Sequence, residues 1–276
     1  WKVGFGADDP AAAVESINAK AGERVLSAAH QFADVGFLCH MGDPTGLTVE
    51  VLGSTQLVED GPSGEASTAR ATSDQRRRLS QLAKSRAPPS EGDRPALGQS
   101  SFHSVVGQVT LRSSRQGPAV AFWRDLLGME LLCREDVSQH GFTLLFLAFA
   151  EESEVPADID AIHVREWIYQ LPVTTVEIQV GGSKLGDPIA QAPSYEEVLR
   201  SAKLSLEPNP LPALEGRQAI FSGVHVVIPA TVYDGLAAKA GNAKAEQLYA
   251  VDPDGTPCTL TRGGRRPRTE DTASER

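Results

Sequence analysis

The sequence has few cysteines and no long apolar run. Its 276 residues include three cysteines, Cys39, Cys133 and Cys258, which lie far apart and show no CxxC spacing. An odd, scattered set of this kind indicates buried, reduced thiols rather than a disulfide framework or a zinc knuckle. No apolar run approaches the ~18–20 residues that a membrane span needs, and no signal-peptide pattern is present. We therefore expect no membrane span.

Several familiar catalytic motifs and an excess of positive charge are missing as well. The chain contains no GxGxxG, no Walker GxxxxGK, no GxSxG elbow and no HExxH, so the chemistries that depend on those motifs are not indicated. The 26 Lys and Arg residues are outnumbered by 36 Asp and Glu residues, which gives a formal charge of −10. Because such a field repels phosphate backbones and anionic lipid surfaces, we do not expect nucleic acid as a partner.

What the sequence does contain is an internal repeat of three blocks, which we call A (residues 1–53), B (104–182) and C (219–262). Each block begins with an apolar strand, continues with an amphipathic helix and ends with further strand-like runs separated by turns. The helix of block B is expected at about 117–127, ending at Gly128, with Phe122 and Trp123 in the core. We expect each block to form one βαβββ module.

The segments between the blocks have a different composition. Residues 54–103 are rich in Ser, Gly, Pro, Arg and Gln and contain no aromatic residue before Phe102, which predicts a flexible polar linker. Within this linker SDQRRRLSQLAKSR is a short basic helix, either solvated or a docking element. Residues 183–218 form a connecting segment with one helix at YEEVLRSAK, and residues 263–276 form a disordered polar tail.

The repeat predicts how the blocks associate. Because a single module leaves one sheet face bare, modules must pair, and we expect an α+β fold of paired βαβββ modules. Three is an odd number, so one block either lacks its partner because the N-terminus is cut or finds it on another chain. The chain begins at Trp1 rather than Met, which indicates either removal of a targeting segment or an incomplete sequence. The expected compartment is therefore the cytoplasm or, after removal of a targeting segment, a plastid or mitochondrion.

Several motifs carry a resemblance to a known family. Block B contains GQVTLR, AFWRDLLGMELL, FTLLFLAF and REWIYQLPVTTVEI, and blocks A and C contain GDPTGLTVEVL and VDPDGTPCTL. With these motifs the chain resembles the glyoxalase I type of the vicinal-oxygen-chelate superfamily. The resemblance implies paired modules that curl into half-barrel sheets. It also implies a divalent metal, of the zinc or nickel type, held by four side chains, two from each of two modules.

The resemblance implies particular metal ligands. Gln108 matches the first-strand ligand and Glu177 the last-strand ligand of block B, while Glu50 matches the last-strand ligand of block A. The family's first-strand histidine falls on about Lys2 in block A, and block C has Thr259 where the last-strand glutamate is expected, with His225 near its first-strand position. Independently, Gln108 and Glu177 interrupt apolar strands, where an unpaired polar group is costly. If Gln108 and Glu177 are not metal ligands, the alternative is that both lie on the solvent-facing side of a half-buried sheet.

The family chemistry supplies the first functional hypothesis, a lactoylglutathione lyase-like enzyme. It would isomerise the hemithioacetal of a 2-oxoaldehyde with a thiol, with glutathione as co-substrate, while the metal stabilises an enediolate. Glu50 would be the catalytic base and Glu177 its counterpart. Arg112 matches an arginine that binds a glutathione carboxylate, and it is equally well explained as an exposed arginine near a strand end.

Departures from the family pattern support a second hypothesis. Block A has lysine for histidine, block C has lost its glutamate, and IQVGG follows Glu177 where a polar run is expected. These losses are typical of a catalytically degenerate protein that serves as a structural or binding subunit of a larger assembly, or forms a homodimer. His30, His40 and His163 are expected to be surface or core histidines rather than replacement ligands.

Overall fold

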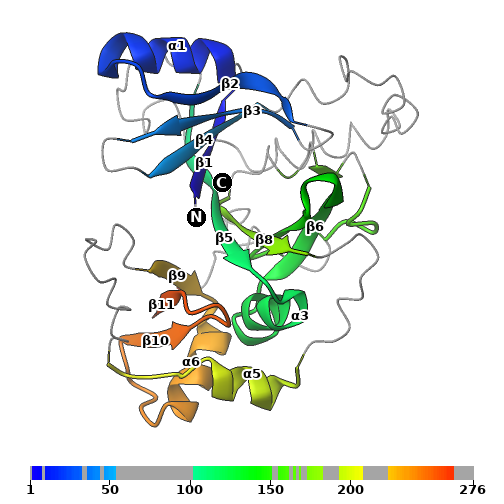
Figure 1. Cartoon of the computed structure of the whole chain (residues 1–276). Coiled ribbons are helices and arrows are strands. Elements are labelled where there is room, and N and C mark those ends of the chain that lie inside the picture. Colours follow the sequence, from blue (N-terminus) through cyan, green and yellow to red (C-terminus); the bar gives the residue numbers. More distant parts are fainter. Residues whose placement is uncertain are drawn as a thin grey trace, which may run out of the picture. The chain divides into compact units, whose positions relative to one another are not determined.

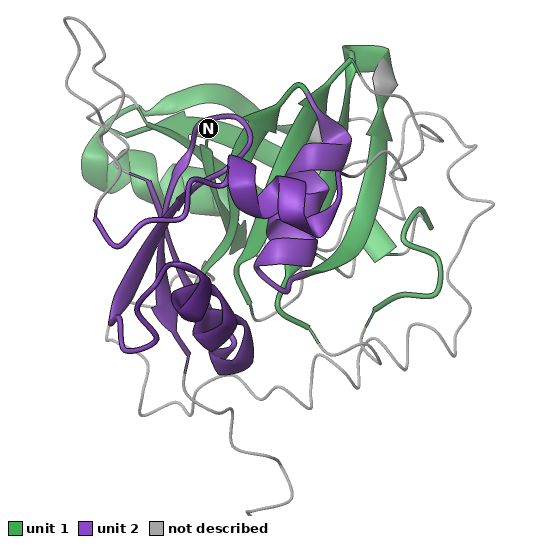
Figure 2. Cartoon of the chain, turned by 90° about the horizontal axis from the view of Figure 1, so that it is seen from below, with its two compact units in different colours: residues 1–114, 130–187 green, residues 115–129, 188–276 purple. Residues whose placement is uncertain are grey.

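The structure is a computed structural model that divides the chain into two compact units (Figure 2). Unit 1 comprises residues 1–114 and 130–187, and unit 2 comprises residues 115–129 and 188–276. The residues described are 2–7, 10–32, 36–43, 47–53, 102–150, 155–161, 164–165, 168, 173–182, 193–207 and 223–263. The expected linker helix and the expected disordered tail from residue 264 onward lie outside these residues.

Unit 1 contains the strands of blocks A and B (Figure 1). Its elements are β1 (Lys2–Ala7), α1 (Pro10–Ala21), β2 (Val25–Phe32), β3 (Gly36–Gly42), β4 (Thr48–Gly53), β5 (Phe102–Ser113), β6 (Glu130–Val137), the short 3-10 helix η4 (Ser138–His140), β7 (Phe142–Ala148) and β8 (Thr175–Gly181). The strands form one eight-stranded sheet in the order β2-β3-β4-β1-β5-β8-β7-β6.

The strand order shows two modules of the same internal arrangement. In each half the first strand runs parallel to the last, as β1 does to β4 and β5 to β8. The halves meet where β1 and β5 pair antiparallel. Block A is therefore the partner of block B, and the expected α+β fold of paired βαβββ modules is confirmed.

One face of the block A half is covered by its own helix. The apolar residues of α1, Ala13, Val14 and Ile17, pack in one cluster with Cys39, Met41 and Val51. Because side chains alternate across a strand, the residues next to these in β3 and β4, among them His40 and Glu50, point to the opposite face. The polar residues singled out in the sequence lie on that face.

Unit 2 contains the helical segment of block B together with block C. Its elements are α3 (Gln116–Val120), the π-helical η3 (Ala121–Leu126), α5 (Tyr195–Ser201), β9 (Val224–Ile228), α6 (Ala230–Lys239), β10 (Gln247–Val251) and β11 (Pro257–Arg262). Phe122 and Trp123 of η3 are buried, as expected. None of the described helices is long and apolar enough to cross a membrane.

Block C is one strand short of a full βαβββ module. Every residue from Gly223 to Gly263 is described, and this stretch forms a strand, a helix and two further strands, in the sheet order β10-β11-β9. The sequence predicts these same elements, with AEQLYAV and TPCTLTR as the two strands after the helix. An isolated antiparallel bridge joins Ser205 to Tyr249 beside β10, so a single residue from before block C lies where a further strand would be.

Candidate functional site

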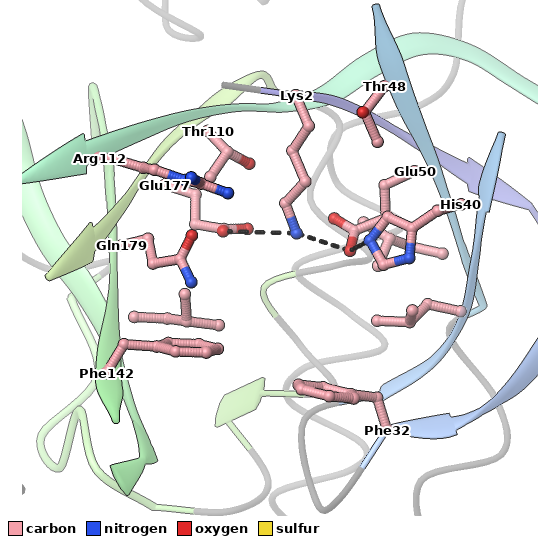
Figure 3. Close-up of a pocket in the computed structure, with 13 residues that line it drawn as sticks. Lys2, Phe32, His40, Thr48, Glu50, Thr110, Arg112, Phe142, Glu177 and Gln179 are labelled. Carbon is pink, nitrogen blue, oxygen red and sulfur yellow. Dashed lines mark hydrogen bonds and ion pairs between the residues drawn. The ribbon is translucent and has the colours of Figure 1, made fainter. Parts of the chain in front are cut away.

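A buried polar cluster lies on the face of the unit 1 sheet opposite to α1. Figure 3 shows Glu50 and Glu177 of this cluster with Lys2. Glu50, Gln108 and Glu177 are only 2%, 2% and 1% exposed, so the structure brings the three predicted site residues together. Their burial rules out the alternative of a solvent-facing position for Gln108 and Glu177. Their proposed roles as metal ligands and catalysts remain predictions.

Strand register explains how these side chains meet. Gly4 of β1 lies between Glu50 of β4 and Gln108 of β5 in the two adjoining ladders. A Cβ on Gly4 would lie 2.9 Å from Cδ of Gln108 and 3.2 Å from Leu52. The absence of a side chain at residue 4 therefore lets the amide of Gln108 reach Glu50, to which its Nε2 donates at 2.8 Å, and also Glu177.

Lys2 supplies a positive charge in the middle of the cluster. Its Nζ donates to Glu50 Oε1 at 2.6 Å and lies 3.8 Å from Glu177 Oε1. The second distance is too long for a hydrogen bond, but it is an ion-pair contact. In Figure 3 the ammonium group lies between the two carboxylates.

The two carboxyl groups differ in their tendency to ionise. Burial opposes the charge of Glu50, but the Lys2 ammonium and the hydrogen bond from His40 outweigh it and hold its pKa below the ordinary value. Burial raises the pKa of Glu177 to about 7, against the attraction of Lys2 and with the help of the nearby Glu50 charge. Burial also disfavours charge on Lys2, yet Glu177 and Glu50 raise its pKa above the ordinary value. The cluster therefore holds one firm ion pair and one carboxyl that titrates near neutrality.

His40, which the sequence does not single out as a site residue, lies beside Glu50 in this cluster. Its Nε2 lies 3.0 Å from Glu50 Oε1, and its Nδ1 lies 3.1 Å from the hydroxyl of Ser27. The hairpin register, in which Gly42 pairs with Thr48 and His40 with Glu50, is the signal that could have found it. Counting outward from the GDPTG turn places His40 directly opposite Glu50.

The cluster forms the floor of a cavity of about 300 Å³. Side chains from β2 and β7, which are far apart in the strand order, line the same cavity, so the sheet must curl around it. Arg112, the predicted substrate-binding residue, also lines it. The full lining is Lys2, Phe32, Leu38, His40, Thr48, Glu50, Leu52, Thr110, Arg112, Phe142, Leu144, Glu177 and Gln179.

The other described candidates are not among the residues that line this cavity. His225 and Thr259 pair across β9 and β11 of unit 2, and His225 is exposed with its Nε2 3.0 Å from the Thr261 hydroxyl. His30 is exposed and bonds the carbonyl of Ala28 through Nδ1. His163 lies outside the described residues.

The cluster does not fit the four-ligand metal site that the resemblance implies. A metal needs lone pairs that converge on one point, but the space between Glu50 and Glu177 is occupied by the ammonium of Lys2, which has three donors and no acceptor. Gln108 turns its N–H groups, not its carbonyl oxygen, toward both carboxylates. Within the described part of the chain, no three His, Cys, Asp or Glu side chains form a group that could hold a metal ion.

The strand order and the curled sheet are those of paired βαβββ modules, the fold that the resemblance to the vicinal-oxygen-chelate superfamily implies. Among solved structures, glyoxalase I from Zea mays has 15% sequence identity and a TM-score of 0.47, covering 95% of this chain and 66% of the maize chain. A trihydroxybiphenyl dioxygenase from Sphingomonas wittichii has 12% identity and a TM-score of 0.26, covering 97% and 72%. This chain thus spans about two thirds of the maize enzyme. No protein-family model matches the sequence, and no curated protein is significantly similar to it.

Proposed function

We propose that this chain is a catalytically degenerate glyoxalase-fold protein that binds a small molecule in the cavity of unit 1. In this proposal it does not act as a metal-dependent lactoylglutathione lyase. The observation that carries the proposal is the position of Lys2 Nζ, 2.6 Å from Glu50 and 3.8 Å from Glu177. An attached ammonium there neutralises the carboxylates and repels a second cation.

The retained cavity supports a binding role. Degeneration of a site without any selection for binding would leave no reason to keep a hollow of about 300 Å³ lined by both charged and aromatic side chains. A cavity of this size, with a few convergent polar groups and apolar walls, has the character of a small-molecule site. The expected larger assembly or homodimer remains a separate prediction.

Metal titration of the purified chain tests the proposal. We expect no stoichiometric binding of Zn²⁺ or Ni²⁺ by calorimetry, metal content well below one ion per chain by elemental analysis, and no thioester formation from methylglyoxal and glutathione. One tightly bound metal per chain, with lyase activity that is lost on Glu177→Gln, would overturn it.

A gain-of-function variant makes the test sharper. Lys2→His replaces the ammonium by the neutral imidazole that metals prefer, so this variant should acquire measurable Zn²⁺ or Ni²⁺ affinity through Glu50, Gln108 and Glu177. Lys20→His, on the exposed end of α1, is the matched control and should acquire none. If the wild-type chain binds metal as tightly as Lys2→His, the lysine does not block the site and the proposal is wrong.

A further inference from the structure

The cavity of unit 1 has two chemically different ends. One end is apolar, with the rings of Phe32 and Phe142 on opposite sides (Figure 3), and Leu38, Leu52 and Leu144 also line the cavity. The other end holds the polar cluster together with Thr110 and Arg112. A ligand that fills both ends needs an apolar body and a polar head.

Two cationic side chains, Lys2 and Arg112, line the end of the cavity where the polar head of a ligand would bind. They are close enough for the Arg112 guanidinium to disfavour the charge on Lys2. Among the described residues Arg112 makes no ion pair. Lys2 gives one of its three N–H groups to Glu50, so it has donors to spare. A carboxylate on the ligand would relieve the repulsion between these two cations.

Glu177 has an oxygen that lacks a hydrogen-bond partner. Its Oε1 is buried and no described residue donates to it within hydrogen-bond distance, while the nearby Thr110 hydroxyl acts to lower the pKa of Glu177. Leaving a buried polar atom in this state costs about 1–3 kcal/mol. A hydroxyl group can either donate or accept, so it would satisfy this oxygen whether or not the carboxyl is protonated.

The spacing of these groups restricts the ligand further. Lys2 Nζ lies only 3.8 Å from Glu177 Oε1, so the ligand groups that meet them must be near neighbours. We infer that the cavity takes a small 2-hydroxycarboxylate, whose carboxylate meets Lys2 and Arg112, whose hydroxyl meets Glu177 Oε1 and whose apolar body lies between Phe32 and Phe142. This inference rests on the proposed function, because it takes the cavity to be a metal-free binding site.

Calorimetry with mandelate as the probe tests the inference on the full chain. We expect mandelate to bind, and three analogues to bind about tenfold or more weakly, since a lost hydrogen bond or buried ring is worth at least ~1.4 kcal/mol. The analogues are phenylacetate, which lacks the hydroxyl, 1-phenyl-1,2-ethanediol, which lacks the carboxylate, and lactate, which lacks the ring.

Variants assign each ligand group to its partner. Arg112→Gln should weaken mandelate about tenfold and leave the diol unchanged, because only mandelate carries the charge that Arg112 meets. Phe142→Ala should weaken mandelate but not lactate. Arg262→Gln is the control, because Arg262 forms an exposed ion pair with Asp234 in unit 2, and it should change nothing.

The outcomes separate this inference from the proposed function. Equal affinity for mandelate, phenylacetate and the diol, or no binding of any of them, would overturn the inference. Either result would leave the proposed function, a protein without a catalytic metal, unaffected. Mandelate binding that appears only after Zn²⁺ or Ni²⁺ is added would overturn the proposed function. Mandelate binding that is insensitive to Arg112→Gln would overturn the assignment of its carboxylate.

Discussion

Gly4 and Gln108 are neighbours across β1 and β5, and the side chain of Gln108 fills the space that a Cβ on Gly4 would need. This arrangement places one amide group against two buried carboxylates that belong to different modules. The contact between the modules is therefore made by a side-chain cluster as well as by the backbone ladder.

Gly4→Ala should destabilise unit 1 by about 1–3 kcal/mol, because overpacking forces Gln108 and its neighbours to move. Chemical denaturation measures the change in the free energy of unfolding. Gly181→Ala is the matched control, since Gly181 ends β8 and no atom lies within 4 Å of an added Cβ. Equal effects of the two substitutions would show that Gln108 has room to adjust.

Lys2→Met keeps the apolar stem of the lysine and removes its charge. Without the ammonium, Glu50 and Glu177 are left as buried carboxyls without their cation, and we expect a loss of up to about 3–5 kcal/mol at pH 8. The loss should shrink at pH 5, where the carboxyls can protonate. Thermal unfolding at both pH values measures this, with Lys239→Met, an exposed partner of Glu196, as a control expected to be nearly neutral.

Glu177 should give the folding stability a particular pH dependence. Its pKa is raised from 4.5 to about 7 in the folded chain, so the folded state holds more protons than the unfolded state between these values. The stabilisation is complete below about pH 4.5 and is lost as the pH rises through about 7. Its upper limit is about 3 kcal/mol.

Urea denaturation of the wild-type chain and Glu177→Gln, at pH 5 and pH 8, isolates this contribution from that of other titrating groups. The wild-type chain should lose more stability than the variant between the two pH values. A larger loss in the variant would mean that Glu177 is ionised throughout and that Lys2 dominates its surroundings.

The contacts from Ser27 through His40 to Glu50 should be energetically coupled in their contribution to the free energy of unfolding. Ser27 accepts the backbone N–H of His40 at 3.0 Å in addition to its contact with the ring. Ser27→Ala and His40→Ala should each cost about 1 kcal/mol, and the double variant should cost less than their sum. A double-mutant cycle by denaturation measures the coupling, and strict additivity would contradict a continuous chain.

The three cysteines should react slowly in the folded chain. Cys39, Cys133 and Cys258 are all free and buried, and burial raises the pKa of the Cys39 thiol to about 11. A disulfide reagent should therefore label fewer than three thiols rapidly at pH 8, and all three after denaturation. Rapid labelling of a specific cysteine in the native chain would show that its surroundings open.

Much of the fold and the centre of the site could be predicted from the sequence. Gln108 and Glu177 stand out because they interrupt apolar strands, and Glu50 repeats the pattern in the other module. The alternation of side chains along strands then places all three on one sheet face. Such patterns can be recognised from the sequence because they involve residues that are close together along the chain.

The remaining features depend on contacts between strands, which local patterns do not contain. Lys2 was expected at a ligand position, but its role as a central cation follows only from the strand order β4-β1-β5-β8, which brings Glu50 and Glu177 to either side of it. His40 joins the site through the register of a hairpin. Block C differs from the other blocks because two strands, rather than three, follow its helix, and the two strand-like runs at AEQLYAV and TPCTLTR already indicate this.

An aromatic contact between the modules also affects access to the cavity. Phe32 at the end of β2 stacks on His140 with ring centroids 4.9 Å apart, so a residue that lines the cavity in one module touches the other module far from the β1–β5 ladder. Such a contact is worth about 0.5–1.5 kcal/mol, only one to three times the thermal energy. Phe32 also packs against the buried cluster of block B that contains Leu144 and Phe146, so the two modules are joined at the apolar end of the cavity as well as at the ladder. Solvent can enter past Phe32 only if the end of β2 gives up both contacts.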